Sequence, residues 1–242
     1  LAIKLAWRNL IGAGLRTWLN VVVLSFSFVV IIWMKGVLTG WDHQAKTDMT
    51  NWEIGNGQYW HEAWDPYDPM TLNDSHAPIP DLLRPLMESG NMEPSLLVQG
   101  TLYPQGRMQS VIIRGVNPDQ TLLHLPTESM NADPDAIPAV IASHMARSAR
   151  LREGDLVILR WRDINGTFDA AEVQVTAIFS ANVPSIDAGQ IYIPLDRLQQ
   201  MTGLHDEATL LTFRNSEDLK EEIPGWVLKS KQDLTRSVDE LI

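Results

Sequence analysis

The feature that most constrains this chain is a long apolar run close to its amino terminus. Between Thr17 and Met34 the sequence carries no charged residue. A helix rises about 1.5 Å per residue, so roughly 20 residues are needed to cross the hydrocarbon core of a bilayer. The stretch from Trp18 to Leu38 has this length. We therefore predict a transmembrane helix over residues 17–40.

Two other kinds of segment carry an apolar run near an amino terminus. A secretory signal peptide has an apolar core of roughly 7 to 15 residues and a small-x-small cleavage site. Here the run is longer, and "MKGVLTGWDHQ" (residues 34–44) contains no such site. A buried core helix of this length is rarely apolar on all sides. An uncleaved anchor is therefore favoured, and its small polar residues are expected to pack against other spans. These residues are Asn20, Ser25 and Ser27.

The charges beside the run indicate its orientation. Three basic residues precede it, whereas the basic residues after it are mixed with Asp42 and Asp48. Loops rich in lysine and arginine stay in the cytoplasm, so we expect a cytoplasmic amino terminus and an extracytoplasmic, periplasmic main domain. Before the run, apolar residues recur at helical spacing, which predicts an amphipathic helix over residues 1–16 on the cytoplasmic surface. The apolar positions are Ile3, Trp7, Leu10, Ile11 and Leu15.

Charge and cysteine content exclude several classes of function. Four of the 19 lysines and arginines lie before residue 41, which leaves 15 basic against 30 acidic side chains in the remainder, a net charge of −15. Phosphate binding needs a basic face, so the acidic remainder argues against a nucleic-acid partner. The chain has no cysteine, which excludes thiol catalysis, zinc–cysteine sites and disulfides.

After residue 40 the pattern changes to short strands and helices. Strands are expected where β-branched and aromatic residues lie between turn signals: residues 57–63, 95–103, 107–116, 138–143, 155–161, 167–180, 190–194, 208–213 and 226–230. Helices are expected at residues 81–90, 144–154, 195–203, 216–223 and 231–242, with Ser143 as the cap of the second. This mixed order indicates an α+β domain over residues 41–230, either whole or as two subdomains. Residues 231–242 are expected to begin a helix that leads to a second span.

One motif resembles a catalytic site, and it is incomplete. "HEAWD" (residues 61–65) is similar to the metalloprotease signature His-Glu-x-x-His, but Asp65 stands where the second histidine is needed and Pro66 follows. The other histidines have no ligand spacing, and no glycine is followed by the lysine of a phosphate-binding loop. We therefore expect no catalytic, metal-binding or cofactor-binding residue in this chain.

Five aromatic residues crowd into sixteen positions shortly after the anchor: Trp52, Tyr59, Trp60, Trp64 and Tyr67. One interpretation makes them a membrane-proximal surface that contacts an acyl chain, a peptide or a partner membrane protein. The other places them in the core or at the bilayer interface, where aromatic residues serve more often than in dedicated sites.

Several stretches match a known family in their order and spacing. They are "LAWRNLIGAGLRTWL" at the start of the span, "VIIRGVNPD", "PAVIASHMARSARLREGDLVIL", "VQVTAIFS" and "GQIYIPLDRLQQMTG". Together they cover nearly the whole chain and resemble the MacB/FtsX-type permeases of ABC transporters, which include lipoprotein-releasing and macrolide-exporting members. Each stretch alone is weakly specific.

The resemblance implies a permease subunit in a bacterial inner membrane. An ATPase, separate or fused, then binds ATP and drives movement of the extracytoplasmic domain for export of lipoprotein, lipid, peptide or drug. Candidates for the ATPase contact are Trp7, Arg8 and Asn9 in the amino-terminal helix. The implied partners are the ABC ATPase, a second permease copy or paralogue, membrane lipids, and a lipoprotein or a periplasmic or outer-membrane protein. A singly anchored envelope interaction protein without transport activity is the alternative.

Overall fold

The computed structural model describes residues 2–12, 14–131, 136–181, 183–187, 189–215 and 222–239. The chain divides into two compact units. The first, which we call the anchor unit, runs to Gln44, and the second, the globular unit, begins at Ala45.

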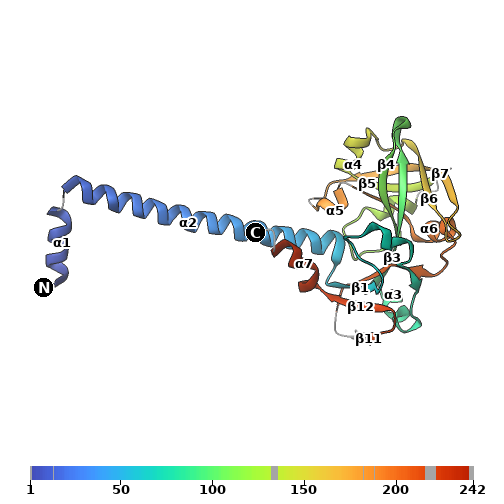
Figure 1. Ribbon diagram of the computed structural model, residues 1–242, viewed down its shortest axis with the longest axis horizontal. Coiled ribbons are helices and arrows are strands. Elements are labelled where there is room, and N and C mark those ends of the chain that lie inside the picture. Colours follow the sequence, from blue (N-terminus) through green and yellow to red (C-terminus); the bar gives the residue numbers. More distant parts are fainter. Residues whose placement is uncertain are drawn as a thin grey trace. The chain divides into compact units, whose positions relative to one another are not determined.

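Two helices make up the anchor unit, α1 (Ala2–Gly12) and the amino-terminal part of α2 (Gly14–Met49) (Figure 1). The helix expected over residues 1–16 therefore ends early, near a glycine with the positive φ of +69° at position 14. By length and composition, one helix of the described residues is able to cross a membrane, and its most apolar window has a mean hydropathy of 2.4. None of that window is buried.

The apolar side chains of α2 point outward on all sides. Leu24 is 71% exposed and Phe26, two positions later and therefore on the opposite face of the helix, is 68% exposed. Ser27 satisfies its hydroxyl within the helix, because Oγ donates to the carbonyl oxygen of Val23 at 2.8 Å. Leaving a large apolar side chain in water costs about 1.5–3 kcal/mol relative to burial, so a helix of this kind requires an apolar solvent.

The globular unit contains a sheet of ten strands. The strands are β1 (Gly57–His61), β3 (Met92–Tyr103), β4 (Gln109–Val116), β5 (Ile137–Ala142), β6 (Leu156–Arg162), β7 (Phe168–Phe179), β8 (Gln190–Pro194), β10 (Leu210–Phe213), β11 (Glu222–Ile223) and β12 (Trp226–Ser230). A separate pair joins β2 (Ala77–Pro78) to β9 (Glu207–Ala208).

Short helices connect these strands. They are the π-helical turn η1 (Thr50–Ile54), α3 (Arg84–Glu88), α4 (Ser143–Ala149), α5 (Pro184–Asp187), α6 (Leu195–Thr202) and α7 (Lys231–Asp239). Single 3₁₀ turns occur at η2 (Pro69–Asn73), η3 (Asp81–Leu83), η4 (Pro104–Gly106) and η5 (Thr127–Asn131). The α+β fold expected from the sequence is confirmed.

Part of the sheet closes into a barrel because one strand pairs on both edges. The strand order β3-β4-β8-β5-β7-β6 returns to β3, which pairs with β4 and also with β6. At the closure Gly100 lies opposite both Val111 and Trp161. A Cβ atom there would lie 2.6 Å from Cδ1 of Ile113, so the strands approach too closely for a side chain. The pairs β4–β8 and β5–β7 are parallel, and the other pairs in the barrel are antiparallel.

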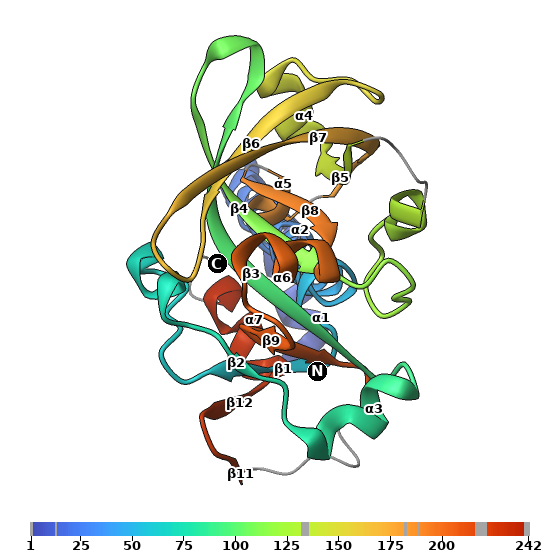
Figure 2. The same cartoon turned by 90° about the vertical axis from the view of Figure 1, so that its right-hand side faces the viewer.

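The first residues of β3 belong to a second set of strands. They pair with β10, and the order continues through β1 and β12 to β11. We call β11, β12, β1, β10 and this part of β3 the side sheet. Figure 2 shows β3 running from the side sheet into the hairpin that it forms with β4.

Four apolar clusters hold these layers together. The barrel interior is filled by its own strands and by residues of α4 and α6, among them Met145 and Leu198. A second cluster covers the outer face of β5 and β8, where Val140 and Tyr192 contact Trp52 and Phe179. The side sheet has one cluster on each face, around Tyr59 on one and Leu97 on the other.

Two expected helices differ from the structure. The helix expected over residues 144–154 ends at Ala149, because Arg150 adopts a left-handed conformation with φ of +56°. Its expected cap, Ser143, is the first helical residue and makes no cap; instead Oδ1 of Asp187 accepts from the backbone N–H of His144 at 2.9 Å. Of the helix expected over residues 216–223, the described part is strand β11, and residues 216–221 lie outside the described residues.

Candidate functional site

A groove of about 980 Å³ lies over one face of the side sheet and the neighbouring barrel strand β4. Successive side chains of a strand point to opposite faces, so alternate residues of each strand reach it. From β1 these are Gln58 and Trp60, and from β4 they are Ile112 and Arg114. Helix α7 and the loop after β1 form the sides of the groove. Its volume is within the range of ligand pockets in proteins, roughly 300–1,000 Å³.

The apolar part of the groove is built around two indoles. The rings of Trp60 and Trp64 meet edge to face, with centroids 4.4 Å apart. Nε1 of Trp60 donates to Oε1 of Gln58 at 2.7 Å, and Nζ of Lys229 lies 5.5 Å from the Trp60 ring centroid. These contacts hold Trp60 in one orientation. The aliphatic lining residues beside the indoles are Leu72, Leu97, Ile112 and Leu210.

Gln58 connects the groove to the turn before β1. Its Nε2 donates to the carbonyl oxygen of Glu53 at 2.9 Å and to Oγ1 of Thr212 at 3.2 Å. Gln58 is buried, and its amide has partners on both ends. It therefore serves as a support for Trp60 rather than as a free polar group.

A buried cation lines the same groove. Arg114 is 2% exposed, and its Nε donates to Oγ of Ser95 at 3.4 Å, a long hydrogen bond. Nη2 of Arg114 has no hydrogen-bond partner among the described residues. Burial raises the pKa of the neighbouring Tyr192 phenol, whereas the charge of Arg114 and a side-chain hydrogen bond with it oppose the shift. Its hydroxyl donates to Oε1 of Gln190 at 2.9 Å.

The rim of the groove carries mostly acidic side chains. Glu62 and Asp65 are exposed, and Oδ1 of Asp65 accepts from the backbone N–H of Tyr67 at 2.9 Å. Asp233 on α7 lies at the opposite wall and caps that helix. His61 also lines the groove, and partial burial lowers the pKa of its imidazole, an effect that nearby Glu62 opposes.

The structure divides the five aromatic residues that the sequence groups together. Trp60, Trp64 and Tyr67 line the groove, and Tyr67 is 84% exposed. Tyr59 points to the opposite face of the side sheet and is fully buried against Phe213, so its assignment to a contact surface is wrong. Strand alternation is the physical reason.

Trp52 also lies away from the groove. It stacks on Phe179 with ring centroids 5.3 Å apart and an interplanar angle of 12°. This half-buried ring packs against the cluster outside the barrel and attaches η1 to it. Trp52 therefore lies apart from Trp60, and its role in a membrane-proximal contact stays a prediction.

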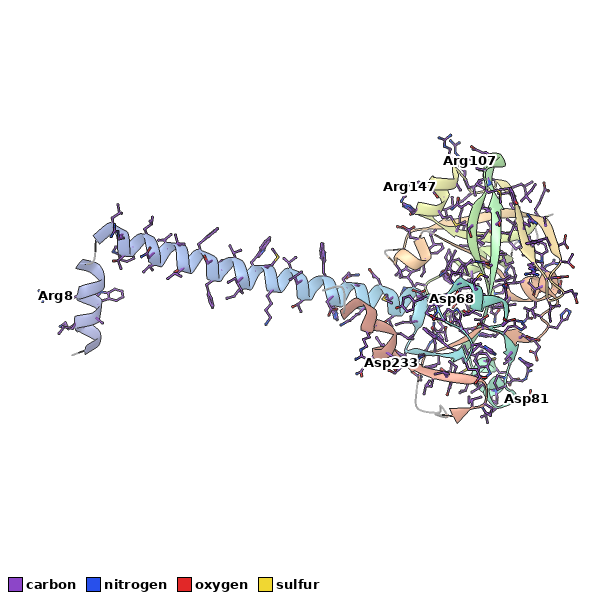
Figure 3. The ribbon with its side chains drawn as sticks, in the orientation of Figure 1. Arg8, Asp68, Asp81, Arg107, Arg147 and Asp233 are labelled. Carbon is purple, nitrogen blue, oxygen red and sulfur yellow. The ribbon has the colours of Figure 1, made fainter. Side chains whose placement is uncertain are left out.

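The candidate residues of the anchor unit lie on its two helices. Trp7 and Arg8 are exposed on α1, and the backbone of Asn9 belongs to the same helix. Figure 3 labels Arg8 on this helix. Asn20, Ser25 and Ser27 are exposed on α2. Their roles in ATPase contact and in packing between spans stay predictions.

The residues of "HEAWD" do not form a metal site in the part of the chain that the structure describes. Strand β1 ends at His61, and Nδ1 of that ring accepts from the backbone N–H of Ala63 at 3.2 Å. No group of three or more His, Asp or Glu side chains among the described residues is placed to hold a metal ion.

Sequence reasoning missed Arg114. The signal was present, because a charge that follows three apolar residues in "VIIRGV" is unusual inside a strand. What the sequence does not reveal is that this side chain faces a groove shared with Trp60. That proximity depends on β10 and β3, which bring β1 and β4 into one sheet.

Comparisons with known proteins find likeness in structure only. No protein-family model and no curated protein sequence matches the chain. The periplasmic region of MacB from Actinobacillus actinomycetemcomitans is similar with a TM-score of 0.49 and 12% identity, covering 77% of this chain and 94% of that one. The extracellular domain of the noncanonic ABC-type transporter YknZ from Gram-positive bacteria has a TM-score of 0.42 and 12% identity, covering 76% and 94%.

Proposed function

We propose that this chain is part of an ABC transporter permease of the MacB/FtsX type. It is anchored in a bacterial inner membrane with the globular unit outside the cytoplasm. A partner ATPase binds and hydrolyses ATP. Movement of the spans then moves the globular unit during export of lipoprotein, lipid, peptide or drug. The ATP chemistry lies in the partner subunit or in a fused domain, and this chain contributes no catalytic residue.

The observation that carries the proposal is the apolar helix α2, which exposes large side chains on all sides. It is preceded by basic residues and followed by an acidic remainder, which favours a globular unit outside the cytoplasm. Support for transport comes from the matching motifs. The first lies on α1 and the start of α2. The others occupy β4, then β5, α4 and β6, then β7, and then β8 and α6, which together are most of the barrel.

The test is purification of the full-length protein from native membranes in a mild detergent. We expect an ABC ATPase to co-purify or to be fused, with vanadate-sensitive ATP hydrolysis. Replacing Trp7 and Arg8 by alanine should lower the amount of co-purified ATPase several-fold. The matched control is Arg107→Ala, an exposed arginine of the globular unit. A protein that purifies without any ATPase would contradict the proposal and favour the singly anchored alternative.

A further inference from the structure

We propose that the groove over the side sheet binds an amphipathic monoanion, a carboxylate attached to an apolar chain, with the carboxylate on Arg114 and the chain along Trp60 and Trp64. This goes beyond the proposed function, because it concerns binding by the chain alone and requires neither an ATPase nor transport.

The first argument is the state of the Arg114 guanidinium. A buried charge is costly unless it is paired and hydrogen-bonded. Here the side chain is 2% exposed, one hydrogen bond to Ser95 is long, and Nη2 has no partner among the described residues. Tyr192 lies directly opposite on β8 and shares a side-chain hydrogen bond with Arg114, but a neutral phenol supplies no counter-charge. A carboxylate accepts hydrogen bonds from a guanidinium in a planar arrangement, and it would give Nη2 the acceptor that it lacks among the described residues.

The second argument is that sheet geometry aims Arg114 into the groove. It pairs directly with Leu97 across β3 and β4, so the two side chains point to the same face. Leu97 belongs to the apolar cluster that includes Trp60 and Trp64. A ligand whose charged end reaches Arg114 therefore meets apolar side chains immediately beside that end.

The third argument is the distribution of the other charges. The acidic lining residues are Glu53, Glu62, Asp65 and Asp233, and the other basic ones are Lys229 and Arg236. Glu53 is half-buried and has an interaction of its own. The other three acids lie on exposed positions, where they repel a second negative charge, and Lys229 and Arg236 offset only part of that repulsion. The groove therefore favours one carboxylate at its base and disfavours a second at its mouth.

The experiment measures binding of three probes to the full chain in phosphatidylcholine nanodiscs by calorimetry, with empty nanodiscs as the blank. The probes are octanoate, octanamide and octanedioate. We expect octanoate to bind at least tenfold more tightly than the neutral amide and than the dicarboxylate. No binding of octanoate, or equal binding of the acid and the amide, overturns the proposal.

Variants locate the site. Arg114→Met should lower octanoate affinity to that of octanamide while leaving octanamide binding unchanged, and Trp64→Ala should weaken both probes. Arg107→Met is the matched control, since Figure 3 shows Arg107 at the end of the barrel away from Asp233, which lines the groove. Unchanged octanoate binding by a folded Arg114→Met protein overturns the proposal. If circular dichroism shows that this variant does not fold, the comparison of acid, amide and dicarboxylate on the unaltered chain decides.

Discussion

In the side sheet, neighbouring residues of one strand lie on opposite faces, because successive side chains alternate in direction. Tyr59 and Trp60 are neighbours in sequence, yet one is buried under the sheet and the other lines the groove. The same alternation places Ile113 in the barrel and Arg114 outside it. A shift of one residue in register would exchange these roles, so the groove depends on the pairing of β3 with β4.

At the same scale, Glu93 of β3 is expected to make stability depend on pH. Burial raises its pKa from 4.5 to about 7, although a hydrogen bond with Asn117 and the charge of Arg214 oppose the shift. Between these two pH values the Glu93 carboxyl is protonated in the folded chain and ionised in the unfolded chain. The free energy of unfolding therefore falls as pH rises through this window. Above pH 7 the folded chain bears the full free-energy cost of burying the ionised Glu93 carboxylate.

We therefore expect Glu93→Gln to stabilise the chain at pH 8 by about 2 kcal/mol, less than the whole shift implies because the side chain is partly solvated. At pH 4 the two proteins should have the same stability, since the glutamate is protonated in both states. Thermal unfolding of the full chain in detergent, followed by circular dichroism, measures this. Glu88→Gln is the exposed control. An equal effect of Glu93→Gln at both pH values would contradict the prediction.

At the scale of elements, helices end and begin through contacts from other parts of the chain. Helix α4 takes its amino-terminal contact from Asp187 of α5. Helix α7, which forms one wall of the groove, has a local cap instead. Oγ of Ser230 accepts from the backbone N–H of Asp233 at 3.2 Å, and Oδ2 of Asp233 accepts from the backbone N–H of Ser230 at 3.0 Å. This reciprocal pair is a capping box.

Removing the cap should loosen α7 without unfolding the globular unit. We expect Ser230→Ala to cost about 1 kcal/mol and to speed hydrogen exchange in the first turn of α7 roughly fivefold. The hydrogen bonds from Ser230 also lower the pKa of Asp233, so the stabilisation is present above the ordinary aspartate pKa and is lost as pH falls below it. Lys231→Ala, which keeps the cap, is the control. Unchanged exchange in residues 231–236 would show that the cap does not hold the helix.

At the scale of the whole molecule, charge and hydropathy are segregated along the chain. The amino-terminal 40 residues are apolar and basic, and the remainder carries a net charge of −15. The first part is suited to lipid and the second to water, and the basic flank is the basis of the proposed orientation. The chain has no cysteine, so single introduced cysteines report its topology without background.

We expect Tyr67→Cys, at an exposed site, to react with a membrane-impermeant maleimide in intact spheroplasts. Lys4→Cys should react only after the membrane is permeabilised. Adding Arg8→Glu and Arg16→Glu to the Tyr67→Cys variant should lower its labelled fraction by half or more, because the positive flank is removed. Labelling of Lys4→Cys, but not of Tyr67→Cys, in intact spheroplasts would reverse the proposed orientation.

The sequence by itself determined the features that depend on near neighbours. The apolar helix follows from composition, the α+β class follows from the alternation of short periodic segments, and the turn at Pro104–Gly106 follows from residues suited to it. These signals are local because hydrogen bonds within a helix or turn join residues a few positions apart. The end of α4 escaped prediction because Arg150, rather than a glycine, takes the left-handed conformation.

Only the tertiary structure decided which distant residues meet. The second pairing of β3, with β6, closes the barrel, and the parallel pairs β4–β8 and β5–β7 join strands far apart in sequence. The groove exists because β1 and β4 share one face of the sheet, which brings Trp60 and Arg114 to the same cavity. Long-range pairing depends on the packing of the whole core, so no short stretch of sequence encodes it.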